Sequence, residues 1–304
     1  MPDGMTPKRV SRLKAVAPKA AEPSKPKMLL FGKPGIGKTW FSLDFPACYY
    51  IDTEGGAKEA RYIEKLEASG GVYFGPEHGS TSFDEVLGQI KALATEDHPY
   101  RTVVIDSISK LFALEIAREA ERLTDAGKKN EFGADKKPAV GYMRQLVSWL
   151  MRLDMNVILI AHYKAEWGRD KSGERVEIGD TFDCWDKLEY ELDLALHIIK
   201  QGPTRLARVK KSRLGPFPES ESFPLTYDEF ANRYGREVIE GAVHILTLAT
   251  PEQVAEVHRL LDVVKIEDGK IEKWFNAANV LSWDEMDADK IGKVIVHLKE
   301  RIAA

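Results

Sequence analysis

A glycine-rich motif, GKPGIGKT at residues 32–39, directly follows the short apolar run MLLF. Its two spaced glycines, its lysine and its threonine fit the pattern of a phosphate-binding loop, and a strand before it is the context that this motif requires. The glycines let backbone N–H groups curl around phosphates, while the helix that follows points its positive end at them. No other feature constrains the fold as strongly, because it predicts a strand, a loop and a helix in succession. The residues predicted to contact a nucleotide are Gly32, Lys33, Pro34, Gly35, Ile36, Gly37, Lys38, Thr39 and Trp40.

Three side chains account for the chemistry expected beside this loop. Lys38 is expected to neutralise the β- and γ-phosphates of ATP, and the Thr39 hydroxyl to bind Mg²⁺. Asp106 ends the apolar run TVVID, where a carboxylate would hold the same Mg²⁺ directly or through water. The alternative for Asp106 is an aspartate that caps the next helix. ATP and Mg²⁺ are therefore the predicted cofactors, and hydrolysis of ATP to ADP and phosphate is the predicted reaction.

Glu54 is the candidate general base. It follows the run YYID in the string YYIDTEGG, so it stands just past a strand end. A carboxylate at that edge can accept a proton from an attacking water. From the residues alone, a solvated loop glutamate is an equally good interpretation.

Short apolar runs alternate with helical patterns over residues 28–162. Strands that alternate with helices predict right-handed βαβ units, and hence an α/β fold with a mostly parallel sheet covered by helices on both faces. Ligands of such sheets bind outside the carboxyl ends of the strands. The predicted strands are 28–32, 47–52, 102–106 and 156–162, and the predicted helices are 82–95, 108–123 and 140–153.

The chain divides into three parts. Residues 1–26 are rich in lysine, arginine, proline and alanine, which predicts a disordered basic tail. Residues 27–244 hold the α/β core, and strands at 193–200 and 205–213 are expected to add a hairpin to the end of its sheet. Residues 245–304 carry two apolar stripes at helical spacing and predict a small helical module. The aromatic residues expected in the core of this module are Trp274, Phe275 and Trp283.

Composition excludes several classes of protein. Of the 304 residues 43% are hydrophobic, and no apolar run approaches the roughly 18 residues needed to span a membrane. The N-terminal residues lack the apolar segment of a secretory signal. The two cysteines, Cys48 and Cys184, have no metal-binding spacing, so a reducing, cytoplasmic setting is expected. The net charge of −4 excludes a uniformly basic nucleic-acid coat but leaves local basic patches open.

Three further strings resemble segments of RecA-like recombinases. YYIDTEGGAKEAR is similar to the segment of these proteins, archaeal RadA above all, that carries the catalytic glutamate. VVIDSISKLF resembles their Walker-B segment. VKKSRLGPF resembles the strand and turn that, in RecA and in DnaB-type helicases, sends two basic residues into the ATP site of the neighbouring subunit. The resemblance covers residues 28–220 and is greatest to the phage RecA-like ATPases that serve as single-strand annealing proteins.

The resemblance implies a role for each matching residue. Glu54 would activate the attacking water, and Arg61 would pack on the adenine. His162 stands where RecA and DnaB have a glutamine that senses the γ-phosphate; a histidine can donate the same hydrogen bond, with a protonation state that matters near neutral pH. Lys211 and Arg213 match the basic pair that acts in trans, so the chain is expected to assemble head-to-tail into a ring or a filament. The alternative for His162 is a strand-end histidine that is hydrogen-bonded to backbone. The alternative for Lys211 and Arg213 is a solvated run of charges.

In RecA-like proteins the DNA-contacting loops follow the Walker-B helix and the sensor strand, which corresponds here to residues 125–142 and 163–187. Both are expected to be mobile loops whose basic residues contact phosphates and whose aromatic residues stack on bases. Both also contain acidic residues, so an ordinary polar loop is the alternative. The basic residues are Lys128, Lys129, Lys136, Lys137, Lys164, Arg169, Lys171 and Arg175, and the aromatic residues are Phe132, Tyr142 and Trp167.

The resemblance thus implies an ATP-dependent single-stranded DNA-binding protein that acts in recombination or annealing and hydrolyses ATP at a site shared between subunits. Its implied partners are single-stranded DNA, further copies of the chain and a single-strand-binding protein, in the cytoplasm of a bacterial host if a phage encodes it. The alternative within the same branch is a helicase or helicase loader. A small-molecule phosphotransferase is disfavoured because the sequence has no arginine-rich lid segment. A binding-only module is disfavoured because the lysine, threonine and both carboxylates of the site are present.

Overall fold

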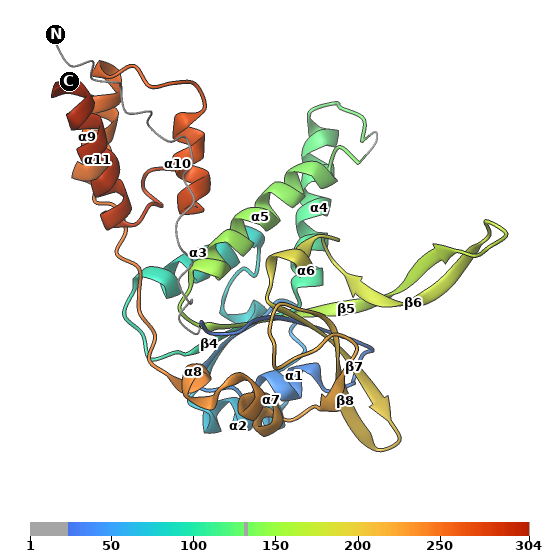
Figure 1. The fold of residues 1–304 in the computed structure, drawn as a ribbon. Coiled ribbons are helices and arrows are strands. Elements are labelled where there is room, and N and C mark those ends of the chain that lie inside the picture. The colour runs from blue at the N-terminus through green and yellow to red at the C-terminus, as the bar shows by residue number, and fades with distance from the viewer. Residues whose placement is uncertain (1–23, 131–132, 304) are drawn as a thin grey trace, which may run out of the picture.

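One sheet organises most of the chain. The structure, a computed structural model, describes residues 24–130 and 133–303. Within these residues nine strands form the sheet in the order β3-β2-β4-β5-β1-β7-β8-β9, and β6 pairs with the outer part of β5 (Figure 1). The strands are β1 (Lys27–Phe31), β2 (Cys48–Asp52), β3 (Val72–Phe74), β4 (Thr102–Asp106), β5 (Asn156–Arg169), β6 (Arg175–Asp183), β7 (Leu194–Gln201), β8 (Thr204–Ser212) and β9 (Ser222–Pro224).

The helices differ from the predicted ones mainly at their ends. Ser82 caps α3 as its sequence pattern predicts, because its hydroxyl accepts a hydrogen bond from the N–H of Glu85 at 3.3 Å. None of the helices in the described part of the chain is both long and apolar enough to cross a membrane. The α-helices are α1 (Lys38–Ser42), α2 (Ala60–Ala68), α3 (Phe83–Thr95), α4 (Ile108–Asp125), α5 (Lys136–Arg152), α6 (Leu188–Glu191), α7 (Tyr227–Tyr234), α8 (Arg236–Glu240), α9 (Pro251–Val263), α10 (Lys270–Ala278) and α11 (Ala288–Ala303).

Helices cover both faces of the sheet and create two hydrophobic cores. Successive residues of β1 face opposite sides. Leu29 and Phe31 pack with α3, α4 and α5, whereas Met28 and Leu30 pack with α1, α2, α7 and α8. Strands that are apolar along their whole length are typical of a parallel sheet buried on both faces. The predicted fold class, an α/β core with a mostly parallel sheet and C-terminal helices, is confirmed.

The parallel strands β2, β4, β5 and β1 bring the candidate site residues to one edge of the sheet. Asp52 lies opposite Asp106 in the β2–β4 register, and Phe31 lies opposite Ala161 in the β1–β5 register. The phosphate loop follows β1 directly, and His162 follows Ala161. Because the strands are parallel, these segments meet at the carboxyl edge, where ligands of such sheets bind.

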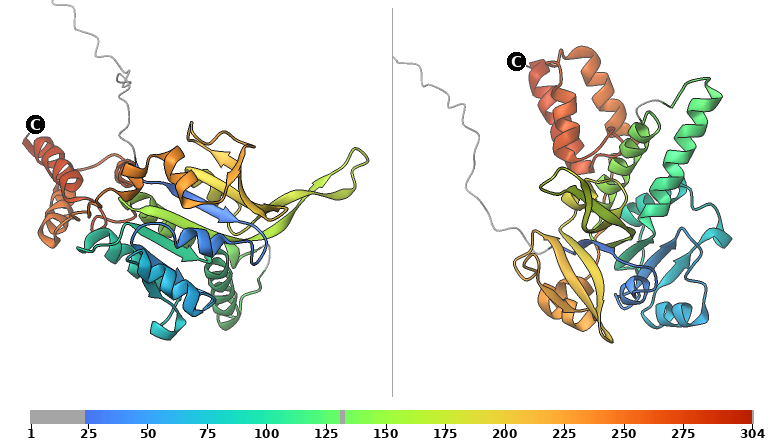
Figure 2. Two further views of the ribbon diagram at one scale, coloured as in Figure 1. Left: turned by 90° about the horizontal axis from the view of Figure 1, so that it is seen from below. Right: turned by 90° about the vertical axis from the view of Figure 1, so that its right-hand side faces the viewer.

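The prediction that residues 163–187 form a mobile loop is wrong, because most of this segment is a β-hairpin. β5 continues beyond the sheet and β6 returns antiparallel to it. The side chain of Asp170 closes the turn by accepting the N–H groups of Ser172 and Glu174 at 2.8 and 3.0 Å. Charges scattered along both strands obscured the strand pattern in the sequence. We call residues 163–182 the arm, and Figures 1 and 2 show it projecting away from the rest of the sheet.

The loop predicted at residues 125–142 is much shorter in the structure. α5 already begins at Lys136, whose N–H donates to the Asp135 side chain at 2.8 Å. Tyr142 therefore lies on a helix and packs against the first core, so it is not a residue of a mobile loop. Phe132 lies outside the described residues.

The predicted disorder of the N-terminal tail falls mainly on residues 1–23, which lie outside the described residues. Lys25, which the sequence pattern assigned to that tail, is buried in the structure. Its Nζ donates to the carbonyls of Val238 and Gly241 at 2.9 and 2.8 Å, beside the end of α8. The last carbonyls of a helix have no partner within it, so a lysine can satisfy them. Lys25 thus belongs to the folded part of the chain.

The C-terminal helices α9, α10 and α11 pack around a core of their own that includes Val257, Leu260 and Leu298. Trp283 is buried in this core and meets the ring of Phe275 edge-on at a centroid distance of 4.7 Å. These aromatic residues pack inside the module, as predicted from the sequence.

Glu285 attaches this module to the core. Its buried Oε1 accepts hydrogen bonds from Trp149 Nε1 at 3.2 Å and from Lys91 Nζ at 3.1 Å. Arg152 on α5 donates to the Glu285 carbonyl at 2.7 Å and to Asp287 at 2.8 Å. A buried carboxylate that is paired in this way would be left uncompensated if the module separated.

Candidate nucleotide site

The phosphate loop joins β1 to α1 in the predicted order of strand, loop and helix. Gly35 and Gly37 have φ angles of 70° and 107°, a region that favours glycine. The ammonium group of Lys38 lies inside the loop and donates to one of its carbonyls at 2.8 Å. Burial lowers the pKa of Lys38, although the carboxylates of Asp106 and Glu54 act in the opposite direction. The loop therefore holds a partly desolvated cation that faces two carboxylates.

Thr39 and Asp106, the residues predicted to hold Mg²⁺, are in contact. The Thr39 hydroxyl donates to Asp106 Oδ2 at 2.7 Å, and the Tyr50 hydroxyl donates to the same oxygen at 2.6 Å. Burial raises the pKa of the Asp106 carboxyl, and these two hydrogen bonds oppose that rise. A half-buried carboxylate beside a hydroxyl suits a hard cation that prefers oxygen ligands, so the residues fit Mg²⁺. When bound, the ion would neutralise charge on the β- and γ-phosphates.

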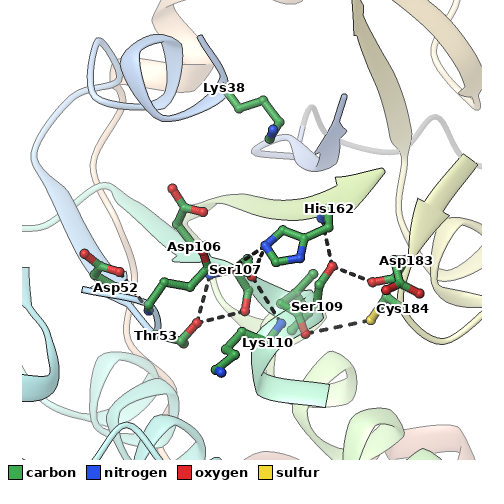
Figure 3. A network of polar contacts seen from close by, with 12 residues as sticks. Lys38, Asp52, Thr53, Asp106, Ser107, Ser109, Lys110, His162, Asp183 and Cys184 are labelled. Atoms are coloured by element: carbon green, nitrogen blue, oxygen red, sulfur yellow. Dashed lines mark hydrogen bonds and ion pairs between the residues drawn. The ribbon is translucent and has the colours of Figure 1, made fainter. Parts of the chain in front are cut away.

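Glu54, the predicted base, lies next to His162, the predicted sensor of the γ-phosphate. His162 Nε2 lies 2.6 Å from Glu54 Oε1, and the Ser107 hydroxyl donates to the same carboxylate oxygen. Ser107 Oγ is also 3.3 Å from His162 Nε2. Figure 3 shows Ser107 and His162 side by side, with Lys38 above them. The structure thus brings together two predicted residues that are 108 positions apart.

Asp52, the last residue of β2, holds the loop that carries Glu54. Its Oδ1 accepts the N–H of Glu54 at 2.9 Å and that of the next residue at 2.7 Å, and its Oδ2 accepts the N–H of Ala57 at 2.8 Å. Thr53 ties the same loop to Ser107, because its hydroxyl donates to the Ser107 carbonyl at 3.0 Å and accepts the Ser107 N–H at 2.9 Å. The position of Glu54 is therefore set by backbone contacts on both sides of it.

Ser109 connects the site to the base of the arm. The backbone N–H of His162 donates to Ser109 Oγ at 2.8 Å, and the Ser109 hydroxyl donates to the Asp183 carbonyl (Figure 3). His162 and Asp183 are paired residues of β5 and β6. One hydroxyl from the start of α4 thus bridges the two strands where the arm leaves the sheet.

Two cavities flank the phosphate loop. One, of about 560 Å³, is lined by residues that include Lys38, Glu54 and His162. The other, of about 640 Å³, is lined by residues that include Trp40 and Arg61. The Arg61 guanidinium lies 4.8 Å from the centroid of the neighbouring Tyr62 ring, which meets the Trp40 ring edge-on at 5.8 Å. Arg61, the predicted adenine contact, therefore stands beside aromatic rings in the second cavity, whereas Glu54 lines the first.

Lys211 and Arg213 line neither of these cavities. They lie at the far end of β8, and the rise of a strand puts them roughly 20 Å from the end beside the phosphate loop. Their side chains donate to backbone carbonyls that precede β7, and burial lowers the pKa of Lys211, with the charge of Arg213 acting in the same direction. Lys210 falls at a β-bulge in the pairing with β7, and its Nζ lies 3.0 Å from Glu166 on the arm.

Several residues of the site could not be found by the sequence analysis. Tyr50, Asp52 and Ser107 occur within the quoted strings, but only the strand register shows that their polar atoms reach Asp106 or Glu54. Arg205 begins the segment RLARVKKSR, and nothing in that string indicates that its Nε donates to the carbonyl of Ile36 in the phosphate loop at 2.9 Å.

Comparison with known proteins identifies a family for the α/β core. A family model described as an AAA domain matches residues 24–220, which is well over half of the chain and includes the phosphate loop and both carboxylates. The comparison with curated proteins finds none that matches. The matched range ends before the C-terminal helices, so the comparison bears on the α/β core.

Proposed function

Because this chain belongs to the AAA-domain family and carries an AAA-type ATPase domain at residues 24–220, we propose that it hydrolyses ATP to drive binding and annealing of single-stranded DNA. The contact that best supports hydrolysis is the one between Glu54 and His162 at 2.6 Å, on the same side of the phosphate loop as Asp106. It places a carboxylate that can accept a proton next to a group that can donate to a phosphate oxygen.

Each residue has a defined part in the proposed hydrolysis. Lys38 binds the β- and γ-phosphates, while Thr39 and Asp106 hold Mg²⁺. Glu54 takes a proton from the water that attacks the γ-phosphorus, and a base placed in this way contributes roughly 10²- to 10⁴-fold to a rate. His162 donates to the phosphate as negative charge builds up on it. Water supplies the new P–O bond, and ADP leaves with the electron pair of the broken bond.

Two projecting surfaces support the proposal of single-stranded DNA binding. Lys128, Lys129, Lys136 and Lys137 are exposed around the short connection between α4 and α5. Lysines on a projecting tip can neutralise backbone phosphates at any sequence. On the arm, Trp167 is 51% exposed, and an exposed indole can stack on a base.

The resemblance to RecA and DnaB proteins motivates a further part of the proposal, an ATP site completed by a second copy of the chain. Lys211 is on β8 and Arg213 directly follows this strand, and the rise of a strand puts both roughly 20 Å from the end of β8 that lies beside the phosphate loop. Any nucleotide that they contact would belong to another subunit. Such a contact is head-to-tail and generates a ring or a filament.

The ATPase rate with and without single-stranded DNA tests this proposal. We expect ATP hydrolysis that single-stranded DNA stimulates, loss of hydrolysis in Lys38→Ala, and annealing of complementary strands in the presence of ATP. A rate that no nucleic acid changes would contradict the DNA-binding part. ATP-driven separation of a duplex without annealing would favour the helicase alternative.

A further inference from the structure

Arg205 reaches the phosphate loop from a distant segment of the same chain. It is the second residue of β8, where its backbone pairs with Lys200 of β7 on one side and its carbonyl accepts the N–H of Leu225 at 3.0 Å on the other. Its Nε donates to the Ile36 carbonyl at 2.9 Å. Strand pairing on both sides therefore fixes the backbone from which this side chain reaches the loop.

The Arg205 side chain also packs against the glycine that precedes α1. A Cβ atom on Gly37 would lie 3.0 Å from Arg205 Cδ and 3.1 Å from Nε, closer than side chains ordinarily pack. The guanidinium thus lies against the outside of the loop, in the wall of the second cavity, together with Arg61 and Tyr62. Glu54 does not line this second cavity and lies in the wall of the first.

Most of the hydrogen-bonding capacity of this guanidinium is unused. Arginine carries five N–H donors in a rigid fork, and only Nε is engaged by an acceptor in the part of the chain that the structure describes. The one carboxylate in the wall of this cavity, Asp44, is paired with Lys65 at 2.7 Å. The remaining donors of Arg205 therefore face a cavity whose negative charge is already compensated.

We propose that Arg205 is a nucleotide-binding residue that contacts the portion of ATP between the α-phosphate and the ribose. Nε holds the phosphate loop at Ile36, and the two terminal nitrogens bind oxygen atoms of the nucleotide. A guanidinium suits both tasks at once, because its fork can bind two acceptors, whereas a lysine ammonium is a single point of charge. This inference rests on the proposed ATP binding and adds a residue that the phosphate-loop motif does not contain.

Equilibrium titration with ATP and with ADP tests the assignment, using Arg205→Gln and Arg205→Lys. Glutamine keeps a donor for the Ile36 carbonyl but removes the charge. Loss of a charge-assisted hydrogen bond corresponds to a Kd raised about 10- to 100-fold, by the same factor for both nucleotides because both contain the α-phosphate and ribose. Arg205→Lys should fall between the wild type and Arg205→Gln. Arg208→Gln is the matched control, since strand alternation directs Arg208 to the other face of the sheet.

The unfolding temperature without nucleotide separates binding from a purely structural role. We expect it to be unchanged in Arg205→Gln, while the stabilisation by saturating ADP shrinks. A lowered unfolding temperature without nucleotide, or Kd values within twofold of the wild type, would overturn the assignment. A wild-type protein that binds neither nucleotide would instead overturn the proposed function, and the assignment with it.

Discussion

The imidazole Nε2 of His162 and the carboxylate Oε1 of Glu54 are 2.6 Å apart; Glu54 follows β2, His162 lies within β5, and β4 separates these two strands. Ser107, which follows β4, donates to the same carboxylate oxygen. Two side chains, one that follows β4 and one within β5, therefore fix one oxygen atom of Glu54. The orientation of Glu54, the proposed base, therefore depends on His162, which would also contact the γ-phosphate.

Replacement of His162 tests this dependence. His162→Ala removes a donor to the developing charge and frees Glu54 to rotate, so we expect kcat to fall about 10²-fold. His162→Gln retains a donor of similar reach and should recover much of the rate. Steady-state ATPase kinetics of the two variants provide the comparison. If His162→Ala hydrolyses ATP at the wild-type rate, the contact with Glu54 has no part in the reaction.

Asp52 should matter for the rate because it holds the loop that carries Glu54. Asp52→Ala leaves the N–H groups of Glu54 and Ala57 without their acceptor, so the loop loosens and the base moves. A displacement of about 1 Å can cost 10²-fold in rate, and we expect kcat to fall about 10- to 100-fold with the Kd for ATP little changed. Asp97→Ala, an exposed aspartate that precedes β4, is the control. Equal kcat values for Asp52→Ala and the control would refute a positioning role.

Lys27 makes stability depend on pH. Burial lowers the pKa of this lysine to about 7 from its ordinary value of 10.5, and Nζ donates to the carbonyls of Leu153 and Met155 at 2.6 Å. Between pH 7 and 10 the unfolded chain binds a proton that the folded chain does not, so the free energy of unfolding rises with pH. Well below pH 7 both forms are protonated, and the effect becomes constant.

Urea unfolding at pH 6, 7.5 and 9 measures this linkage. Relative to Lys27→Met, the wild type should gain about 1 kcal/mol of unfolding free energy per pH unit between pH 7.5 and 9. Between pH 6 and 7 the gain should be smaller. The same comparison for the exposed Lys200→Met should be flat. A difference between wild type and Lys27→Met that stays constant from pH 6 to 9 would show that Lys27 is charged in the folded protein.

Mixing two inactive variants tests the shared site. Lys38→Ala keeps an intact Lys211 and Arg213, whereas Arg213→Ala keeps an intact phosphate loop. In a random head-to-tail assembly about a quarter of the interfaces combine the two intact halves, so an equimolar mixture should recover up to about a quarter of the wild-type rate. The ATPase rate of the mixture is compared with that of each variant alone. No recovery on mixing, or a full rate for Arg213→Ala alone, would place the complete site within one chain.

Much of the core could be predicted from the sequence because local signals agreed with one another. The phosphate loop predicts a strand before it and a helix after it, and three of the four apolar runs of strand length end in a polar residue. Parallel strands then bring Glu54, Asp106 and His162 to one edge, so the approximate site follows from topology. The phosphate-loop motif around Lys38 can be identified from the local sequence alone.

The remaining features depend on contacts between distant segments. The sequence of the arm predicts a polar loop because charges are scattered along both of its strands, and few of its residues are buried. Lys25 lies in a stretch whose composition predicts disorder, and its contacts with the carbonyls at the end of α8 are between residues more than 200 positions apart. The contact of Arg205 with Ile36 joins residues 169 positions apart, and no local pattern encodes it.

The rate of ATP hydrolysis by Glu54→Gln tests the proposed role of Glu54 as the general base most directly. Glutamine has nearly the same shape as glutamate but cannot accept the proton from water, so this variant should bind ATP with a Kd close to that of the wild type. Phosphate release should fall about 10²- to 10⁴-fold, while Glu64→Gln, an exposed glutamate on α2, should match the wild type. A Glu54→Gln variant that releases phosphate at the wild-type rate would contradict the assignment of Glu54 as the base.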